Sequence, residues 1–103
     1  MLVNALVRRA NREGGFATVL AKGDATAGAI LIIAQDRGEH ARAYERGVGA
    51  KGDTELLPVG PEGVSQEVTD YWIRRRRNDP DLWVVEVDIA AAERFVAETI
   101  LDG

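Results

Sequence analysis

Hydrophobic residues recur over the first thirteen positions at the spacing of one helix face. Leu2, Leu6 and Ala10 fall on that face, because successive residues of an α-helix lie about 100° apart. The pair Gly14-Gly15 ends the pattern, since glycine readily adopts the left-handed conformation that follows many helices. The pattern predicts a helix over residues 2–13.

Three strands are predicted next, over residues 16–22, 29–34 and 41–46. The first has alternating faces, as expected for a strand. The second is apolar throughout, which is typical of a central strand covered on both faces. A turn around Gly38 connects the second strand to the third, which is more polar and therefore nearer a sheet edge. The short connections favour an antiparallel meander.

The residue pattern in the middle of the chain predicts a weak strand followed by a helix. Residues 54–59 form the weak strand, and Pro58 restricts it to a sheet edge because proline cannot donate a backbone hydrogen bond. The helix covers residues 65–78, because the residue before Pro80 disfavours helical geometry.

The pattern of apolar residues in the last part of the chain predicts a strand over residues 82–88 and a helix over residues 89–101. Asp88 is expected to cap that helix. Trp72 and Trp83 fall on the apolar faces of their elements and are expected in the core or at its rim.

The predicted order is helix, three-strand meander, weak strand, helix, strand, helix. There is no regular alternation of strands and helices, which excludes a doubly wound parallel sheet. We therefore predict a single α+β domain over residues 1–103. It has a mainly antiparallel sheet of about four to five strands packed with three helices.

Composition narrows the function classes. The 103 residues carry a formal net charge of −4, which argues against general nucleic-acid binding. There is no cysteine, which excludes disulfides and thiolate zinc sites and fits a reducing compartment. The longest apolar stretch is far shorter than the roughly 20 residues that span a bilayer. We expect a cytoplasmic protein without membrane contact.

Four segments resemble one small bacterial family, and they occur in the family's order over nearly the whole chain. They are Ala5-Leu6-Val7-Arg8-Arg9, Gly14-Gly15-Phe16-Ala17, Gly23-Asp24 with Ala27-Gly28-Ala29, and Asp79-Pro80-Asp81-Leu82-Trp83-Val84-Val85-Glu86. The last of these is the most specific. The family is domain-of-unknown-function family 1491, so the resemblance implies no activity, cofactor or catalytic residue.

Residues 47–52 match the letters of the dinucleotide fingerprint G-x-G-x-x-G. That motif requires a preceding strand and a following helix whose N-terminus holds the pyrophosphate. After the motif, no helical pattern begins before residue 65, so we favour a flexible hairpin loop. A phosphate-cradling loop that uses Lys51 is the alternative.

Four consecutive arginines, Arg74 to Arg77, form the sharpest basic feature. On a helix they spread over about 300° and cannot make one patch. We expect Arg75 and Arg76 to flank the buried stripe, whereas Arg74 and Arg77 point outward. The acids expected to pair with the inner two are residues such as Asp79, Asp81 or Glu86. The run is either a solvated helix end or an edge that binds an anion or a partner.

Two acidic residues and the single histidine complete the candidates. Glu86 and Asp88 share one strand face, where paired carboxylates could bind a hard cation or transfer protons. The simpler interpretation is the exposed side of an edge strand. His40 lies near a turn and lacks a second histidine or a cysteine, so a transition-metal site is improbable.

We therefore predict a non-enzymatic binding or assembly module, with a protein partner or a second copy as its target. The alternative is a small enzyme, or a binder of a phosphate or nucleotide ligand, that uses Lys51, the Arg74–Arg77 run and Glu86. The candidate binding residues are Arg74, Arg77, Glu86 and Lys51. We assign no catalytic residue, cofactor or metal.

Overall fold

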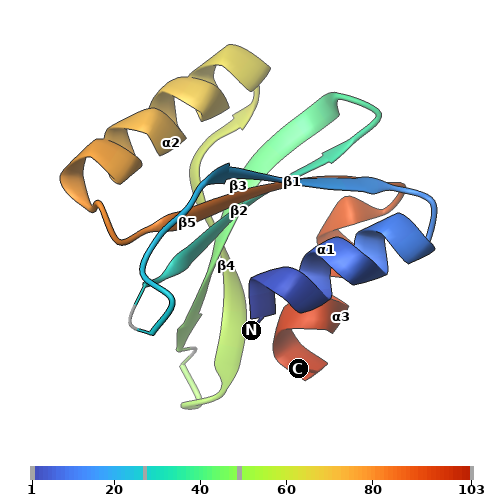
Figure 1. Cartoon of the computed structure of the whole chain (residues 1–103), viewed down its shortest axis with the longest axis horizontal. Helices are drawn as coiled ribbons and strands as arrows, with labels where there is room; N and C mark the ends of the chain where they lie inside the picture. Colours follow the sequence, from blue (N-terminus) through green and yellow to red (C-terminus); the bar gives the residue numbers. More distant parts are fainter. Residues whose placement is uncertain (1, 27, 49, 103) are drawn as a thin grey trace.

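The computed structural model describes residues 2–26, 28–48 and 50–102, which form one five-stranded sheet and three helices (Figure 1). The elements in chain order are α1 (Leu2–Arg12), β1 (Phe16–Ala21), β2 (Ile30–Asp36), β3 (Glu39–Val48), β4 (Thr54–Gly63), α2 (Ser65–Asn78), β5 (Trp83–Asp88) and α3 (Ala92–Asp102). The predicted α+β class is confirmed.

The sheet is mixed, and its strand order is β1-β5-β2-β3-β4. Three of its neighbouring pairs are antiparallel, whereas β2 and β5 run parallel. The predicted three-strand meander is wrong at its first connection, because β5 inserts between β1 and β2. The predicted central position of β2 is correct, since two strands lie on each side of it.

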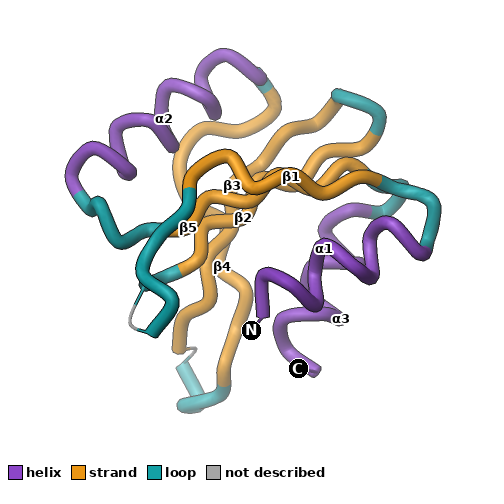
Figure 2. Tube along the Cα trace, in the orientation of Figure 1, coloured by secondary structure: helices purple, strands orange, loops and turns teal. Residues whose placement is uncertain are grey.

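The helices cover both faces of the sheet (Figure 2). Helices α1 and α3 lie on one face, and α2 lies on the other. The core is accordingly divided in two. Leu6, Val85 and Val96 are central to the α1–α3 side, whereas Leu31, Val68 and Val84 are central to the α2 side. Burial of these side chains provides the main driving force for folding.

The two tryptophans occupy the predicted core and core-rim positions. Trp83 is 6% exposed and belongs to the cluster beside α1 and α3. Trp72 is half-buried and packs against the cluster under α2.

Strand β5 is an interior strand, so the interpretation of residues 82–88 as an edge strand is wrong. It pairs with β1 on one side and with β2 on the other. Strand β4 is an edge strand, as Pro58 predicted. Within the described part of the chain, no helix is long and apolar enough to cross a membrane.

Candidate functional site

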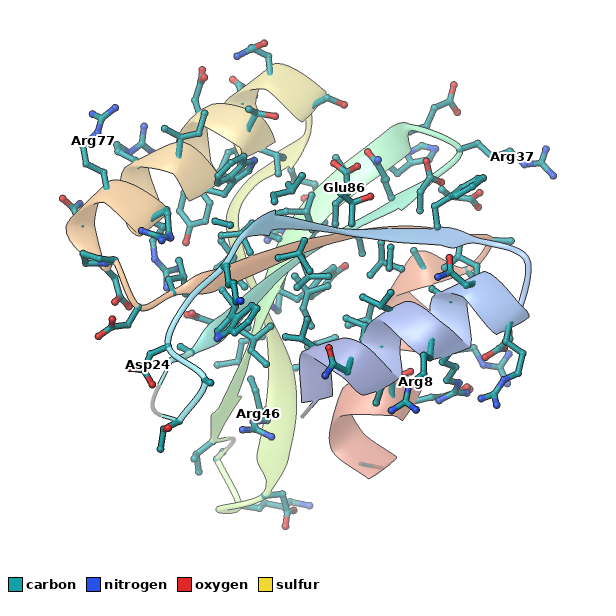
Figure 3. The ribbon with its side chains drawn as sticks, viewed as in Figure 1. Arg8, Asp24, Arg37, Arg46, Arg77 and Glu86 are labelled. Atoms are coloured by element: carbon teal, nitrogen blue, oxygen red, sulfur yellow. The ribbon has the colours of Figure 1, made fainter. Side chains whose placement is uncertain are left out.

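The four binding residues predicted from the sequence lie on three separate elements. Lys51 lies in the β3–β4 connection, Arg74 and Arg77 are exposed on α2, and Glu86 lies on β5. Figure 3 shows Arg77 projecting from the outer side of α2, away from Glu86 on the sheet. Geometry does not gather these residues into one site, and their role in binding stays a prediction.

The arginine run has the predicted helical phase. Arg75 and Arg76 are half-buried, whereas Arg74 and Arg77 are exposed. Arg75 pairs with an acid as expected, although that acid is Glu45. Arg76 instead donates to the carbonyl oxygen of Lys22 at 3.0 Å, so its expected acidic partner was wrong. The inner half of the run therefore ties α2 to the rest of the fold.

Arg75 connects α2 to strand β3. Its guanidinium donates to Glu45 Oε2 at 2.9 Å and to the Tyr71 hydroxyl at 2.8 Å. Burial lowers the pKa of Arg75, but the hydrogen bonds with Glu45 and Tyr71 outweigh this, and the net shift is upward. The charge of Arg75 is used inside the fold and is not offered to a ligand.

Asp88 stabilises the β2–β3 turn through its side chain. Its carboxylate accepts hydrogen bonds from the backbone N–H groups of Arg37 at 2.6 Å and of Gly38 at 3.1 Å. The prediction that Asp88 caps the last helix is therefore wrong, because α3 begins only at Ala92 and the Asp88 carboxylate accepts its hydrogen bonds from the turn.

Glu86 lies two residues before Asp88 and is half-buried. Burial raises the pKa of Glu86, and the negative charge of Asp88 raises it further. Among the described residues, no group of three or more His, Asp or Glu side chains could hold a metal ion.

The described residues of the glycine-rich motif, 47, 48 and 50–52, lie where β3 turns into β4. Strand β3 extends to Val48 and β4 begins at Thr54, so a strand follows the motif where a dinucleotide fold needs a helix. A methyl group at Gly47 would meet the end of the Leu57 side chain, which would have to move. Residue 49 lies outside the described residues. The β3–β4 pairing agrees with the predicted hairpin, and the predicted flexibility of the loop stays a prediction.

The sequence analysis did not identify two adjoining hollows on the α3 side of the sheet. Their volumes are about 360 and 470 Å³, and His40 and Tyr44 line both. Arg94 and Asp36 border the first, whereas Arg42, Pro58 and Glu62 border the second. The spacing His40, Arg42, Tyr44 on one strand face was the signal that could have revealed this surface.

His40 has a left-handed backbone, with a φ of 58°. It lies where the β2–β3 register shifts between Ala34 and Asp36. Non-glycine residues rarely adopt this conformation, and strained residues cluster at binding and catalytic sites. The hollows are therefore a candidate small-ligand site.

The two edges of the sheet differ in chemistry. Strand β4 carries Pro58 and Pro61, together with the exposed acids Glu55 and Glu62. Proline and charge are the usual protection of an edge strand against pairing with another chain. Strand β4 is therefore a guarded edge.

Strand β1 lacks the proline and charge of β4, although its pairing with β5 shifts register between Val19 and Ala21, and such bulges also disfavour pairing with another chain. Its six residues, Phe16-Ala17-Thr18-Val19-Leu20-Ala21, include no charge and no proline. Phe16 is 72% exposed and Val19 is 41% exposed. In Figure 1, β1 runs across the front of the molecule with no helix over its outer edge. We refer to the outer side of residues 16–21 as the open β1 edge.

The protein is thus a small α+β protein whose sheet has two different edges, with proline and charge on β4 and neither on β1. The chain belongs to the DUF1491 family: the model described as a protein of unknown function (DUF1491) matches residues 1–97. The resemblance stated from the sequence is thus confirmed. No curated protein matches the chain.

Solved structures of relatives have the same fold. A crystal structure of a DUF1491 family protein from Caulobacter crescentus CB15 is 40% identical, with a TM-score of 0.76, and the match covers 84% of this chain and 81% of that one. An NMR structure of a DUF1491 family protein from the same organism is also 40% identical, with a TM-score of 0.74, and the match covers 85% of this chain and 81% of that one. The solution structure of protein Atu0922 from A. tumefaciens is 34% identical, with a TM-score of 0.65, and the match covers 85% of this chain and 81% of that one.

Proposed function

We propose that this chain is a binding or assembly module that accepts an extended strand along the open β1 edge. The observation that carries the proposal is the contrast within one sheet. Strand β4 is protected by proline and charge, whereas the six residues of β1 include neither, and no helix lies over the outer edge of β1 (Figure 1). Protection of only one edge is expected if the other edge has a partner.

The backbone of β1 supplies the binding groups. Strand β1 has a single neighbour in the sheet, β5, so half of its backbone N–H and C=O groups point away from the sheet. An added strand would satisfy these groups, and side chains such as Phe16 would provide specificity. The proposal assigns no catalytic residue and no cofactor. A cytoplasmic location remains part of it, as expected from the sequence.

A peptide titration tests the open edge. A synthetic peptide with the sequence of residues 14–23 is added to isotope-labelled protein, and backbone amide signals are followed by NMR. We expect shifts concentrated in β1 and β5, with slower hydrogen exchange over residues 16–21. The variant Val19→Lys should weaken binding, because an inserted lysine opposes edge pairing.

The matched control for Val19→Lys is Val48→Lys. Val48 is 75% exposed at the end of β3, so the same change is made away from the open edge. This variant should bind the peptide as the parent does. Shifts spread over all elements, or equal weakening by both variants, would reject the open edge as the binding site.

A second candidate function is the binding of a small molecule in the hollows at His40. The strained backbone of a residue that lines both hollows favours it. A small-molecule screen by thermal shift tests this candidate on the parent and on His40→Gly, which keeps the backbone conformation but removes the imidazole. Compounds that stabilise the parent and not the variant would support the site, whereas equal stabilisation of both would reject it.

A further inference from the structure

We infer that the two hollows at His40 together bind one small zwitterion, whose ammonium group lies at Asp36 in the first hollow and whose carboxylate lies at Arg42 in the second. This inference rests on the second candidate function, the binding of a small molecule at His40, and adds the chemical class of the ligand. It does not depend on the open β1 edge.

The first hollow lies at a place in the sheet where ligands commonly bind. Strands β2 and β5 run parallel, and in open sheets with parallel strands ligands bind beyond the carboxyl ends of those strands. The first hollow is lined by Gln35 and Asp36 at the carboxyl end of β2 and by Ala91, which follows β5. The pairing of β5 with β2 therefore brings together the two segments that line this hollow.

Backbone strain is concentrated at the same hollow. Among the described residues, three other than glycine have a positive φ, namely Arg37, His40 and Ala91. The φ of His40 is 58° and that of Ala91 is 54°, and both residues line the first hollow. Such residues cost free energy that glycine would not, and they cluster at binding sites. The strain therefore supports a ligand site here.

Asp36 provides the anionic group of the first hollow. The residue is half-buried, and its carboxylate forms no salt bridge with any other residue that the structure describes. Arg94 borders the same hollow, but its guanidinium is bound to Glu98 at 3.1 Å and its side chain is 83% exposed. An ammonium group in the first hollow would therefore meet a carboxylate that has no ionic partner, and the charge would strengthen their hydrogen bond.

Arg42 provides the cationic group of the second hollow. Its side chain is 23% exposed, and its guanidinium donates to Glu62 Oε2 at 3.2 Å. The Glu62 side chain is 83% exposed, and an ion pair with so exposed a partner contributes little to stability. A ligand carboxylate can therefore replace Glu62, and arginine binds carboxylates through two parallel hydrogen bonds.

The spacing of the two charges selects the length of the ligand. Arg42 lies opposite Ala34 in the β2–β3 register, and Asp36 lies two residues further along β2, about 7 Å at the rise of a strand. The hollows meet at His40 and Tyr44, whose rings can contact an uncharged chain between the two charges. The ligand is thus a zwitterion whose ammonium and carboxylate are separated by a short apolar chain, as in an ω-amino acid.

An NMR titration tests the ligand class on the parent protein. The probe is δ-aminovalerate, in which four methylene groups separate the ammonium from the carboxylate, and backbone amide signals of isotope-labelled protein are followed. We expect a Kd of about 1 mM or tighter, with shifts concentrated at residues 34–44 and 58–63. Valerate lacks the ammonium group and pentylamine lacks the carboxylate, so each should bind at least about tenfold more weakly. Free glycine, whose charges are adjacent, should also bind at least about tenfold more weakly.

Two variants assign each charge to its residue. Asp36→Asn should remove the preference for δ-aminovalerate over valerate, whereas Arg42→Gln should remove the preference over pentylamine. The matched controls are Asp53→Asn and Arg46→Gln, since both residues are exposed and neither lines the hollows. Figure 3 shows Arg46 at the other end of the sheet from Arg37 in the β2–β3 turn. Both controls should keep both preferences, and circular dichroism melts establish that the four variants are folded.

The outcomes separate the ligand class from the site. Equal affinity of the parent for δ-aminovalerate, valerate and pentylamine would overturn the zwitterion, as would shifts located away from the hollows. Failure of δ-aminovalerate to bind, together with other compounds that stabilise the parent and not His40→Gly, rejects the ligand class and retains the small-molecule site. If no compound distinguishes the parent from His40→Gly, both are rejected.

Discussion

The indole Nε1 of Trp83 donates a hydrogen bond of 2.8 Å to the backbone carbonyl oxygen of Asp24. In return, the backbone N–H of Asp24 donates to the carbonyl oxygen of Asp81 at 3.0 Å. These contacts join the β1–β2 connection to the start of β5, two segments on which the family resemblance rests. Their specific residues thus have a structural role, because they hold β5 in register between β1 and β2.

Two glycines make this close approach possible, and a methyl group at either should be poorly tolerated. An added Cβ at Gly23 or at Gly28 would overlap the carbonyl oxygen of Asp81. We expect Gly23→Ala and Gly28→Ala each to lower the free energy of unfolding by about 2 kcal/mol or more, as overpacking does. Urea denaturation measures the change. The exposed neighbour Ala25 provides a control, since Ala25→Ser should stay within about 0.5 kcal/mol of the parent.

The two tryptophans should differ in their access to solvent. The variant Trp72→Phe retains only the buried Trp83, so its emission should be blue-shifted and iodide should quench it weakly. The variant Trp83→Phe retains the half-buried Trp72 and should be quenched more strongly. It should also lose about 1 kcal/mol of stability with the hydrogen bond to Asp24. Equal quenching of the two variants would contradict the packing described above.

The arginine run should divide into a structural half and a surface half. Arg75→Ala removes the hydrogen bonds to Glu45 and Tyr71, and we expect a loss of about 1–2 kcal/mol, reduced by the partial exposure of the pair. Arg74→Ala should change stability by no more than about 0.5 kcal/mol, because Arg74 is exposed. Chemical denaturation compares the two variants. A larger loss at Arg74 would mean that the contacts of Arg75 contribute little to stability.

The stability conferred by Glu86 should depend on pH. Its pKa in the folded protein is raised above 4.5, so the folded state binds the proton more tightly than the unfolded state does. The carboxylate therefore destabilises the fold at neutral pH, and this effect disappears as the pH falls through the raised pKa and below 4.5. Glu86→Gln should raise the thermal midpoint at pH 7, and the gain should shrink to zero near about pH 4.

The exposed Glu55 on β4 provides the control for that pH series, through the variant Glu55→Gln. The decisive quantity is the difference in thermal midpoint between variant and parent across the pH range. A gain for Glu86→Gln that grows as the pH falls would reverse the sign of the linkage and reject burial as its cause.

The sequence alone determined most of the local structure. The apolar stripe at Leu6 and Ala10 identified α1, the unbroken apolar run of β2 identified the central strand, and Pro58 identified an edge strand. It also assigned the phase of α2, with Arg75 inside and Arg74 outside. These features follow from periodicity and backbone chemistry, which act over a few neighbouring residues.

Only the tertiary structure decided where β5 lies. Strand β5 is distant in sequence from both β1 and β2, yet it inserts between them, and this placement carries Asp88 to the amides of the β2–β3 turn. The same placement makes β1 an edge strand and gathers His40 and Tyr44 with residues of β4 and α3. Pairing between distant strands depends on burial across the whole sheet, which no local pattern records, so the position of β5 and the edge position of β1 could not be predicted from the sequence.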